Sequence, residues 1–98
     1  MNFDQLYEVF QQQGQKIPAT GKTLKLVLEE GPIFIDMSGE ATEISKSDRE
    51  ADCTVSTTID TLQGLKDGSV NPMMAVMTGK IKVKGDMSIA LKLQSMIA

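Results

Sequence analysis

Residues 71–96 have the sequence NPMMAVMTGKIKVKGDMSIALKLQSM, which contains five of the seven methionines of the chain. Asn71 followed by Pro72 predicts a helix start, because the Asn side chain caps free N–H groups and Pro already has a helical φ. The apolar residues 73–78 continue this helix, and Gly79 follows where a C-terminal cap is expected. The stretch therefore begins with a short methionine-rich helix.

The rest of the stretch predicts a strand and a second helix. Residues 80–84 alternate lysine with apolar side chains, the period-two pattern of a strand with one apolar face. Gly85 is expected to end this strand, and Asp86 is expected to cap a last helix that runs toward Ile97.

The preceding sequence predicts two further helices and four further strands. Apolar residues at helical spacing predict a helix over residues 3–13, and Asp60 is expected to cap another that ends at Gly68. Alternating patterns predict strands at 24–28, 33–37, 41–45 and 52–57. Short turns between consecutive strands predict an antiparallel meander. We therefore expect an α+β fold, a five-stranded and mostly antiparallel sheet with helices over one face.

The composition predicts one small globular domain, residues 1–98. The chain is 41% hydrophobic and 23% charged, but it has only four aromatic residues, so aliphatic side chains and methionines must fill its interior. The net charge of −3 and the absence of basic stretches interleaved with aromatics argue against a nucleic-acid partner.

Location signals in the sequence point to the cytoplasm. The single cysteine, Cys53, suits a reducing compartment. No apolar run approaches the length of about 20 residues that a membrane span needs, and the N-terminus lacks the layout of a secretory signal.

The sequence argues against an enzyme and against a metal or cofactor site. It contains no histidine, the commonest general base and metal ligand. Cys53 alternates with polar residues in a predicted strand, so it is expected to face the core without a base beside it. No phosphate-binding loop or metal-ligand spacing is present.

The last two predicted helices have more apolar surface than one sheet face requires. Core packing is the ordinary explanation for a methionine-rich helix, and a pocket for a pliable apolar ligand is the alternative. Gln94 falls inside the apolar arc of the last helix. It would bond either a backbone group, or the polar end of a ligand or a pocket water.

The stretch also resembles a known family. The ordered trio Asn71-Pro72, Gly79 to Lys82 and Gly85 to Met87, together with ADCTV at Ala51 to Val55, is similar to the sterol carrier protein type two family of lipid-binding domains. The resemblance is nearly continuous from Ala51 onward. It implies an apolar tunnel between sheet and helices that takes fatty acids, fatty acyl-coenzyme A or sterols.

The resemblance also implies which side chains flank the tunnel. They come from the last two helices and the strand between them: Met73, Met74, Val76, Met77, Ile81, Val83, Met87, Ala90, Leu91, Leu93, Gln94 and Ile97. The expected function is binding, and transfer, of small hydrophobic ligands without covalent chemistry. The alternative is a non-catalytic interaction module that presents acyl ligands to a partner enzyme.

Two departures from the family pattern bear on these expectations. The N-terminal segment is short and poor in basic residues, and the chain ends soon after the last helix, so a free-standing microbial member is expected.

The predicted strand 80–84 carries three lysines, Lys80, Lys82 and Lys84. They are either simply solvated, and guard a strand edge, or they touch an anionic membrane or coenzyme phosphates. Transient membrane contact is thus left open, and nothing in the sequence indicates an oligomeric state.

Overall fold

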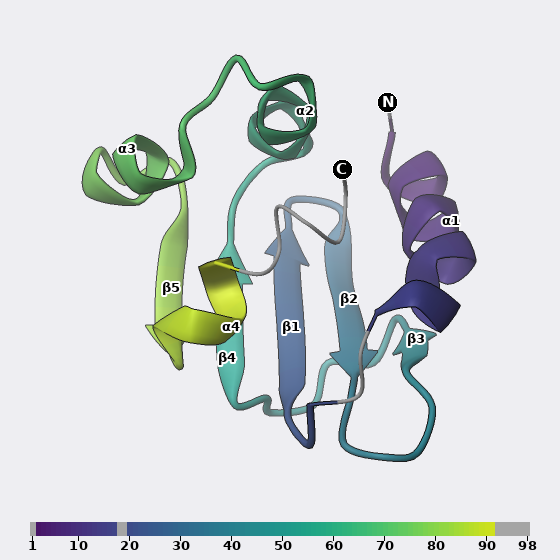
Figure 1. The fold of residues 1–98 in the computed structure, drawn as a ribbon. Helices are drawn as coiled ribbons and strands as arrows, with labels where there is room; N and C mark the ends of the chain where they lie inside the picture. Colours follow the sequence, from purple (N-terminus) through teal and green to yellow (C-terminus); the bar gives the residue numbers. More distant parts are fainter. Residues whose placement is uncertain (1, 18–19, 92–98) are drawn as a thin grey trace.

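A computed structural model describes residues 2–17 and 20–91 of the chain. Helices and strands follow one another in the predicted kinds and order (Figure 1). They are α1 (Phe3–Gln13), the 3-10 turn η1 (Gly14–Lys16), β1 (Thr23–Leu28), β2 (Gly31–Asp36), β3 (Glu43–Ser45), β4 (Cys53–Ser56), α2 (Ile59–Asp67), α3 (Pro72–Met77), β5 (Lys82–Gly85) and α4 (Met87–Leu91).

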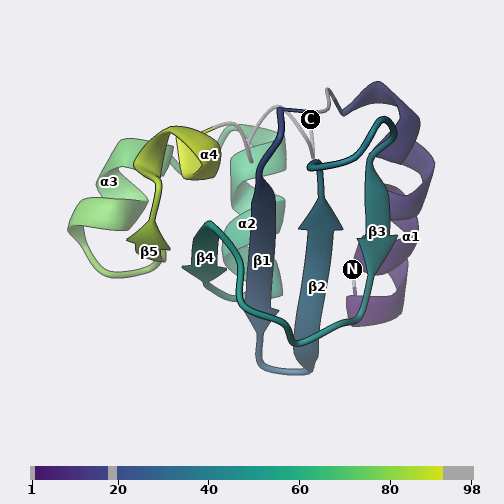
Figure 2. The same cartoon turned by 90° about the horizontal axis from the view of Figure 1, so that it is seen from below.

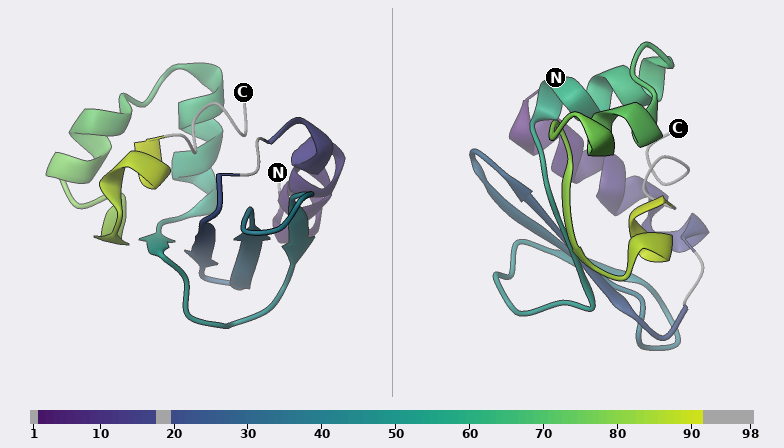
Figure 3. Two further views of the ribbon diagram at one scale, coloured as in Figure 1. Left: turned by 60° about the horizontal axis from the view of Figure 1, so that its bottom comes forward. Right: turned by 90° about the vertical axis from the view of Figure 1, so that its left-hand side faces the viewer.

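The molecule has two layers, a five-stranded sheet and a layer of helices on one of its faces. The strand order is β3-β2-β1-β4-β5. Seen along the sheet, in the right-hand panel of Figure 3, all four α-helices lie on the same side of it. Three of the four strand pairings are antiparallel and one, β1 with β4, is parallel. The predicted α+β class, with a mostly antiparallel sheet and helices over one face, is confirmed.

The predicted meander of consecutive strands is wrong at one point. After β3 the chain does not turn back beside β3 but crosses to the other side of β1, where β4 pairs in parallel. Residues 46–52 make this crossing, and they are too many for the tight turn of a hairpin. Pairing with β1 also places the buried Cys53 and Val55 on the helix-covered face, beside Leu24 and Leu26.

The hydrophobic core lies between the two layers. The sheet contributes the alternate residues of β1, β2 and β4, and every α-helix contributes at least one buried side chain. From the helices these are Leu6 and Phe10 of α1, Ile59, Leu62 and Leu65 of α2, Ala75 of α3 and Ile89 of α4. The apolar residues whose spacing predicted a helix over residues 3–13 thus include those on the buried face of α1.

One aromatic side chain is buried on the opposite face of the sheet. Phe34 points away from the helices yet is buried. The guanidinium carbon of Arg49, in the crossing segment, lies 4.5 Å from the centre of its ring. A cation over an aromatic face is attracted by the ring quadrupole, so this contact helps to hold the crossing segment against the sheet.

The start of α2 differs by two residues from the prediction. Thr58, not Asp60, caps the helix, and its Oγ1 accepts a hydrogen bond of 3.2 Å from the backbone N–H of Thr61. The helix starts at Ile59, whose side chain is buried in the core.

Candidate functional site

The predicted ligand-binding elements lie together at one end of the molecule. Figure 2 shows α3, β5 and α4 beyond β4, at the edge of the sheet opposite α1. At the α1 edge, Gln11 Nε2 donates a hydrogen bond of 3.2 Å to the carbonyl of Ile44 in β3. One sheet edge is thus engaged by a helix, whereas β5 forms the other edge.

Asn71 and Thr78 cap the two ends of α3. Asn71 Oδ1 accepts hydrogen bonds from the backbone N–H groups of Met73 and Met74, at 2.9 and 3.2 Å. The carbonyl of Met74 accepts both the backbone N–H of Thr78, at 2.9 Å, and Thr78 Oγ1, at 2.8 Å. The predicted start at Asn71-Pro72 is confirmed, and these polar contacts explain how so short a helix is held.

Two hydrogen bonds fix the connection from α3 to β5. The backbone N–H of Ile81 donates to the carbonyl of Ala75 at 3.1 Å, and Thr57 Oγ1 donates to the carbonyl of Lys80 at 3.0 Å. The Ile81 N–H and the Lys80 carbonyl therefore bond to groups other than the backbone of a neighbouring strand. As a result β5 begins at Lys82, two residues later than predicted, and Ile81 is buried below α3.

Gly85 and Asp86 connect β5 to α4. Gly85 is the last residue of β5 and pairs with Cys53, so the strand continues through it instead of ending before it. Asp86 Oδ1 accepts hydrogen bonds from Ser88 N and Ser88 Oγ, at 3.0 and 2.6 Å. Its Oδ2 accepts one of 2.8 Å from Lys22 Nζ. The predicted cap is thus present, and it ties α4 to the start of β1.

Because of these contacts, the ionised form of Asp86 stabilises the folded state. The hydrogen bonds from Lys22 and Ser88 hold the pKa of Asp86 well below its usual value of 3.8, and Asp86 in turn raises the pKa of Lys22. Because the unfolded chain binds a proton more readily at this carboxyl, the stabilisation is present above about pH 4. It is lost as the pH falls further, toward the folded-state pKa.

We expect Asp86→Asn to flatten the acid end of the stability profile. In the wild type, the free energy of unfolding should fall steadily below about pH 4. In the variant this fall should be shallower, with the remainder supplied by groups such as Asp36, whose pKa is lowered by Ser38. Urea unfolding at a series of pH values measures both slopes. Equal slopes would mean that Asp86 carries no such role.

The predicted ligand-binding residues divide into four groups in the structure. Ile81 is buried in the core, whereas Val76, Val83 and Ala90 are partly buried and pack against it. The methionines of α3 and α4 are exposed. Leu91 is the last described residue of α4, and Leu93, Gln94 and Ile97, and with them the predicted polar contact of Gln94, lie outside the described residues. The structure thus brings the described members together at one end.

The exposure of the methionines corrects one expectation. Core packing is the ordinary explanation for a methionine-rich helix, but within α3 only Ala75 is buried. Met73, Met74 and Met77 are 60%, 55% and 77% exposed, and Met87 of α4 is 44% exposed. The reason is the position of α3, which lies beyond the edge of the sheet (Figure 1).

Cys53 has no features of a nucleophile. It is buried and pairs with Leu24 and Gly85 in the sheet, and its burial raises the pKa of the thiol. Thiolates are the reactive form of cysteine, so a raised pKa disfavours reaction. The predicted core position of Cys53 is confirmed.

The described part of the chain has neither a metal-binding cluster nor a helix that could span a membrane. Across residues 2–17 and 20–91, no group of three or more acidic, histidine or cysteine side chains is placed to hold a metal ion. Within the same ranges, none of the helices combines the length and the hydropathy that crossing a bilayer requires.

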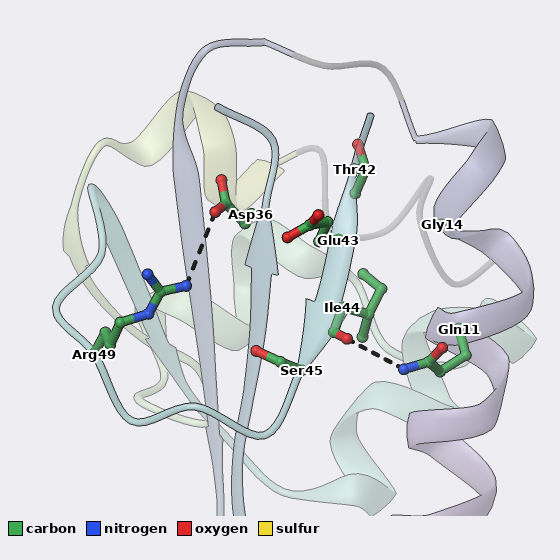
Figure 4. A pocket seen from close by; sticks show the side chains of 8 residues that line it. All are labelled: Gln11, Gly14, Asp36, Thr42, Glu43, Ile44, Ser45 and Arg49. Carbon is green, nitrogen blue, oxygen red and sulfur yellow. Dashed lines mark hydrogen bonds and ion pairs between the residues drawn. The ribbon is translucent and has the colours of Figure 1, made fainter. Parts of the chain in front are cut away.

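A polar hollow at the other edge of the sheet is a feature that the sequence did not predict. It has a volume of about 430 Å³ and is shown in Figure 4. Its lining comprises Gln11, Gly14, Asp36, Thr42, Glu43, Ile44, Ser45 and Arg49. Arg49 Nη2 lies 3.9 Å from Asp36 Oδ2, and the guanidinium also lies over the Phe34 ring. The positive charge of Arg49 therefore already has partners within the fold. Charged walls make this hollow unsuited to an alkyl chain.

Comparison with known proteins gives a match over nearly the whole chain. The model of the SCP-2 sterol transfer family matches residues 3–98. Sterol carrier protein 2 from Rattus norvegicus is 39% identical over 59 residues, which are 60% of this chain. The matched part is 11% of the rat protein, so the chain spans only a small fraction of that relative.

Solved structures show the same fold at low sequence identity. The palmitated SCP2L2 from Aedes aegypti has a TM-score of 0.68 at 18% identity, and the match covers 99% of this chain and 95% of that one. The sec-alkylsulfatase Pisa1 from Pseudomonas sp. has a TM-score of 0.74 at 20% identity, and the match covers 98% of this chain but 16% of the enzyme.

Proposed function

The chain belongs to the SCP-2 sterol transfer family, and from this premise we propose that it binds and transfers hydrophobic ligands without covalent chemistry. Its ligands would be fatty acids, fatty acyl-coenzyme A or sterol-like lipids, taken up in an apolar tunnel between sheet and helices. The residues that we propose to flank the ligand are those predicted from the sequence. The predicted cytoplasmic location and single domain, residues 1–98, remain part of the same proposal.

The observation that carries the proposal is the apolar surface of α3 and α4. Their exposed methionines adjoin the partly buried Val76, Val83 and Ala90, which continue inward to the core. Methionine has a flexible, polarizable side chain that adapts to ligands of different shape. Exposed and partly buried apolar side chains next to the core suit an alkyl chain better than they suit a polar substrate.

Apolar contact alone is sufficient for useful affinity. Burying a twelve-carbon chain contributes about 10 kcal/mol at ~0.8 kcal/mol per methylene. Association and ordering cost at least ~4 kcal/mol of this. The remainder, at most about 6 kcal/mol, corresponds to a Kd of roughly tens of micromolar or weaker. Specificity between alkyl chains of similar length should be low, because few directional groups would fix the ligand.

The absence of chemistry is proposed on two grounds. The sequence has no histidine, and its one thiol is buried in the sheet with a raised pKa. A general acid–base or nucleophilic mechanism needs a titrating or activated group at the ligand. The described residues that we propose to flank the ligand are all apolar, so none of them supplies such a group.

Native mass spectrometry of the purified chain is the direct test. We expect a fraction of the protein to carry co-purified lipid, and we expect the melting temperature to rise on addition of a long-chain fatty acid. At a ligand concentration 100 times Kd, the stabilisation is about 2.7 kcal/mol, or roughly 10 °C or more for a domain of this size. A melting temperature that stays constant across fatty acids, acyl-coenzyme A and sterols would contradict the proposal.

A second candidate function is the presentation of acyl ligands to a partner enzyme. The observation in its favour is that the fold recurs over 16% of the length of an alkylsulfatase, a domain within a larger enzyme. In that case ligand binding would persist, but delivery to a purified enzyme should be faster than release to empty acceptor vesicles. Equal rates would favour simple transfer.

A further inference from the structure

The end of the molecule formed by α3, β5 and α4 carries two kinds of exposed side chain. All the large hydrophobic side chains that are exposed in the described residues lie here: Met73, Met74, Met77 and Met87. Lys80, Lys82 and Lys84, between the two helices in sequence, are exposed as well. We call these seven residues the methionine–lysine surface.

The lysines of this surface are not neutralised within the described part of the fold. Lys22, Lys25, Lys46 and Arg49 all make ion pairs there, whereas Lys80, Lys82 and Lys84 make none. Residues 71–91 contain three lysines and one aspartate, so this segment has a charge of +2 in a chain of net charge −3. The charge of the molecule is therefore unevenly distributed, with its positive part at the methionines.

The strand β5 brings the two kinds of side chain together. Lys82 pairs with Ser56 and Lys84 with Thr54, on the face of the sheet away from the helices, whereas Val83 points toward the helices. Because β5 is an edge strand, the two faces meet along it, and α3 and α4 border its helix side (Figure 2). A flat surface that contacts this edge of the sheet could therefore contact the methionines and the lysines at the same time.

We propose that the methionine–lysine surface docks the protein on an anionic lipid bilayer, with the methionines entering the interface and the lysines at the headgroups. Charge complementarity selects this occupant, since a bilayer with acidic headgroups attracts clustered lysines and accepts apolar side chains beside them. The inference rests on the proposed function in that the membrane would supply the acyl ligand, at the mouth of the proposed tunnel. Lys84 should contribute less than Lys82, because it lines a shallow hollow together with Glu50 and Asp52.

Vesicle sedimentation with the full chain tests the proposal. We expect binding to vesicles of equal parts phosphatidylcholine and phosphatidylglycerol, but not to pure phosphatidylcholine, and weaker binding as salt is added. Each lysine near a charged surface contributes about fivefold to affinity. The double variant Lys82→Glu, Lys84→Glu should therefore bind at least about 25-fold more weakly. The matched control is Lys16→Glu, Lys66→Glu, which changes the net charge by the same amount. Its loss of vesicle affinity should be much smaller than that of the Lys82→Glu, Lys84→Glu variant.

A second measurement separates this inference from the proposed function. Binding of a fluorescent fatty acid in vesicle-free solution should be unchanged in the Lys82→Glu, Lys84→Glu variant, because neither lysine belongs to the proposed tunnel. In the wild type, fatty-acid binding without vesicle binding would overturn the docking surface alone, and vesicle binding without fatty-acid binding would overturn the proposed function alone. Equal loss in the control variant would also overturn the docking surface. So would a stable dimer in sedimentation equilibrium that Met74→Asp disrupts, because a second copy would then cover the methionines.

Discussion

Replacing Gly85 by alanine is expected to destabilise the fold by about 4 kcal/mol, a large share of the 5–15 kcal/mol typical of small domains. Gly85 has a φ of +105°, which L side chains rarely adopt. A Cβ atom there would overlap the carbonyl oxygen of Asp52 and lie 3.2 Å from Cys53 Cα. Backbone strain and a displaced strand each cost on the order of 1–3 kcal/mol. Urea unfolding followed by circular dichroism measures the loss.

Gly79 provides the matched control for this variant. Its φ is +80°, also positive, but a Cβ atom would meet no other atom within 4 Å. Gly79→Ala should therefore cost only about 1 kcal/mol, the strain of the left-handed conformation less the entropy lost by the unfolded chain. Similar losses in the two variants would show that the close approach of Gly85 to Asp52 is unimportant.

Replacing Ala90 by tryptophan is expected to weaken fatty-acid binding by about 100-fold. Ala90 is partly buried on α4 and packs against the core, next to the space in which we propose the alkyl chain to lie. An indole there would displace about four methylenes of the ligand, worth ~0.8 kcal/mol each, or about 3 kcal/mol in total. Fluorescence titration with a long-chain fatty acid measures the change.

Ala41→Trp is the control for the bulk of the new side chain. Ala41 is exposed in the segment between β2 and β3, at the far side of the sheet, so its replacement should leave fatty-acid binding unchanged. The circular dichroism spectra of both variants should match that of the wild type. A folded Ala90→Trp protein that binds with wild-type affinity would remove α4 from the proposed site.

The contrast between Gly85 and Gly79 bears on the meaning of the sequence trio at 71–72, 79–82 and 85–87. In the structure, Asn71 caps α3, Gly85 allows β5 to approach Asp52, and Asp86 caps α4. Each of these roles is architectural. The Asn, Gly and Asp positions of the motif thus position the two methionine-bearing helices, whereas most of the side chains proposed to meet the ligand lie outside the motif.

Local features of the fold were predictable because each has a local cause. Asn71-Pro72 and Asp86 start helices through hydrogen bonds to the next few residues, and the period of two in residues 24–28 follows from one buried face. The order of the strands has no such cause. It depends on contacts between distant segments, such as Arg49 with Phe34, which neither periodicity nor turn signals contain.

The candidate site was predictable to a similar degree. Sequence pattern and family resemblance placed α3, β5 and α4 together, and the structure agrees for their described residues. The exposure of Met73, Met74 and Met77 was not predictable, because an all-round apolar helix is ordinarily buried. The exposure of these methionines results from the position of α3 beyond the edge of the sheet.

The parallel pairing of β1 with β4 has a consequence for how the chain folds. It joins segments 29 residues apart, such as Thr23 and Asp52, while β1 and β2 are neighbours in sequence. Closing so long a loop costs entropy before any contact compensates for it, and non-local pairing slows folding. The hairpin of β1 and β2 can therefore form early, and the arrival of β4 at its open side should limit the rate. The two methionine-bearing helices, which follow β4, would be assembled last.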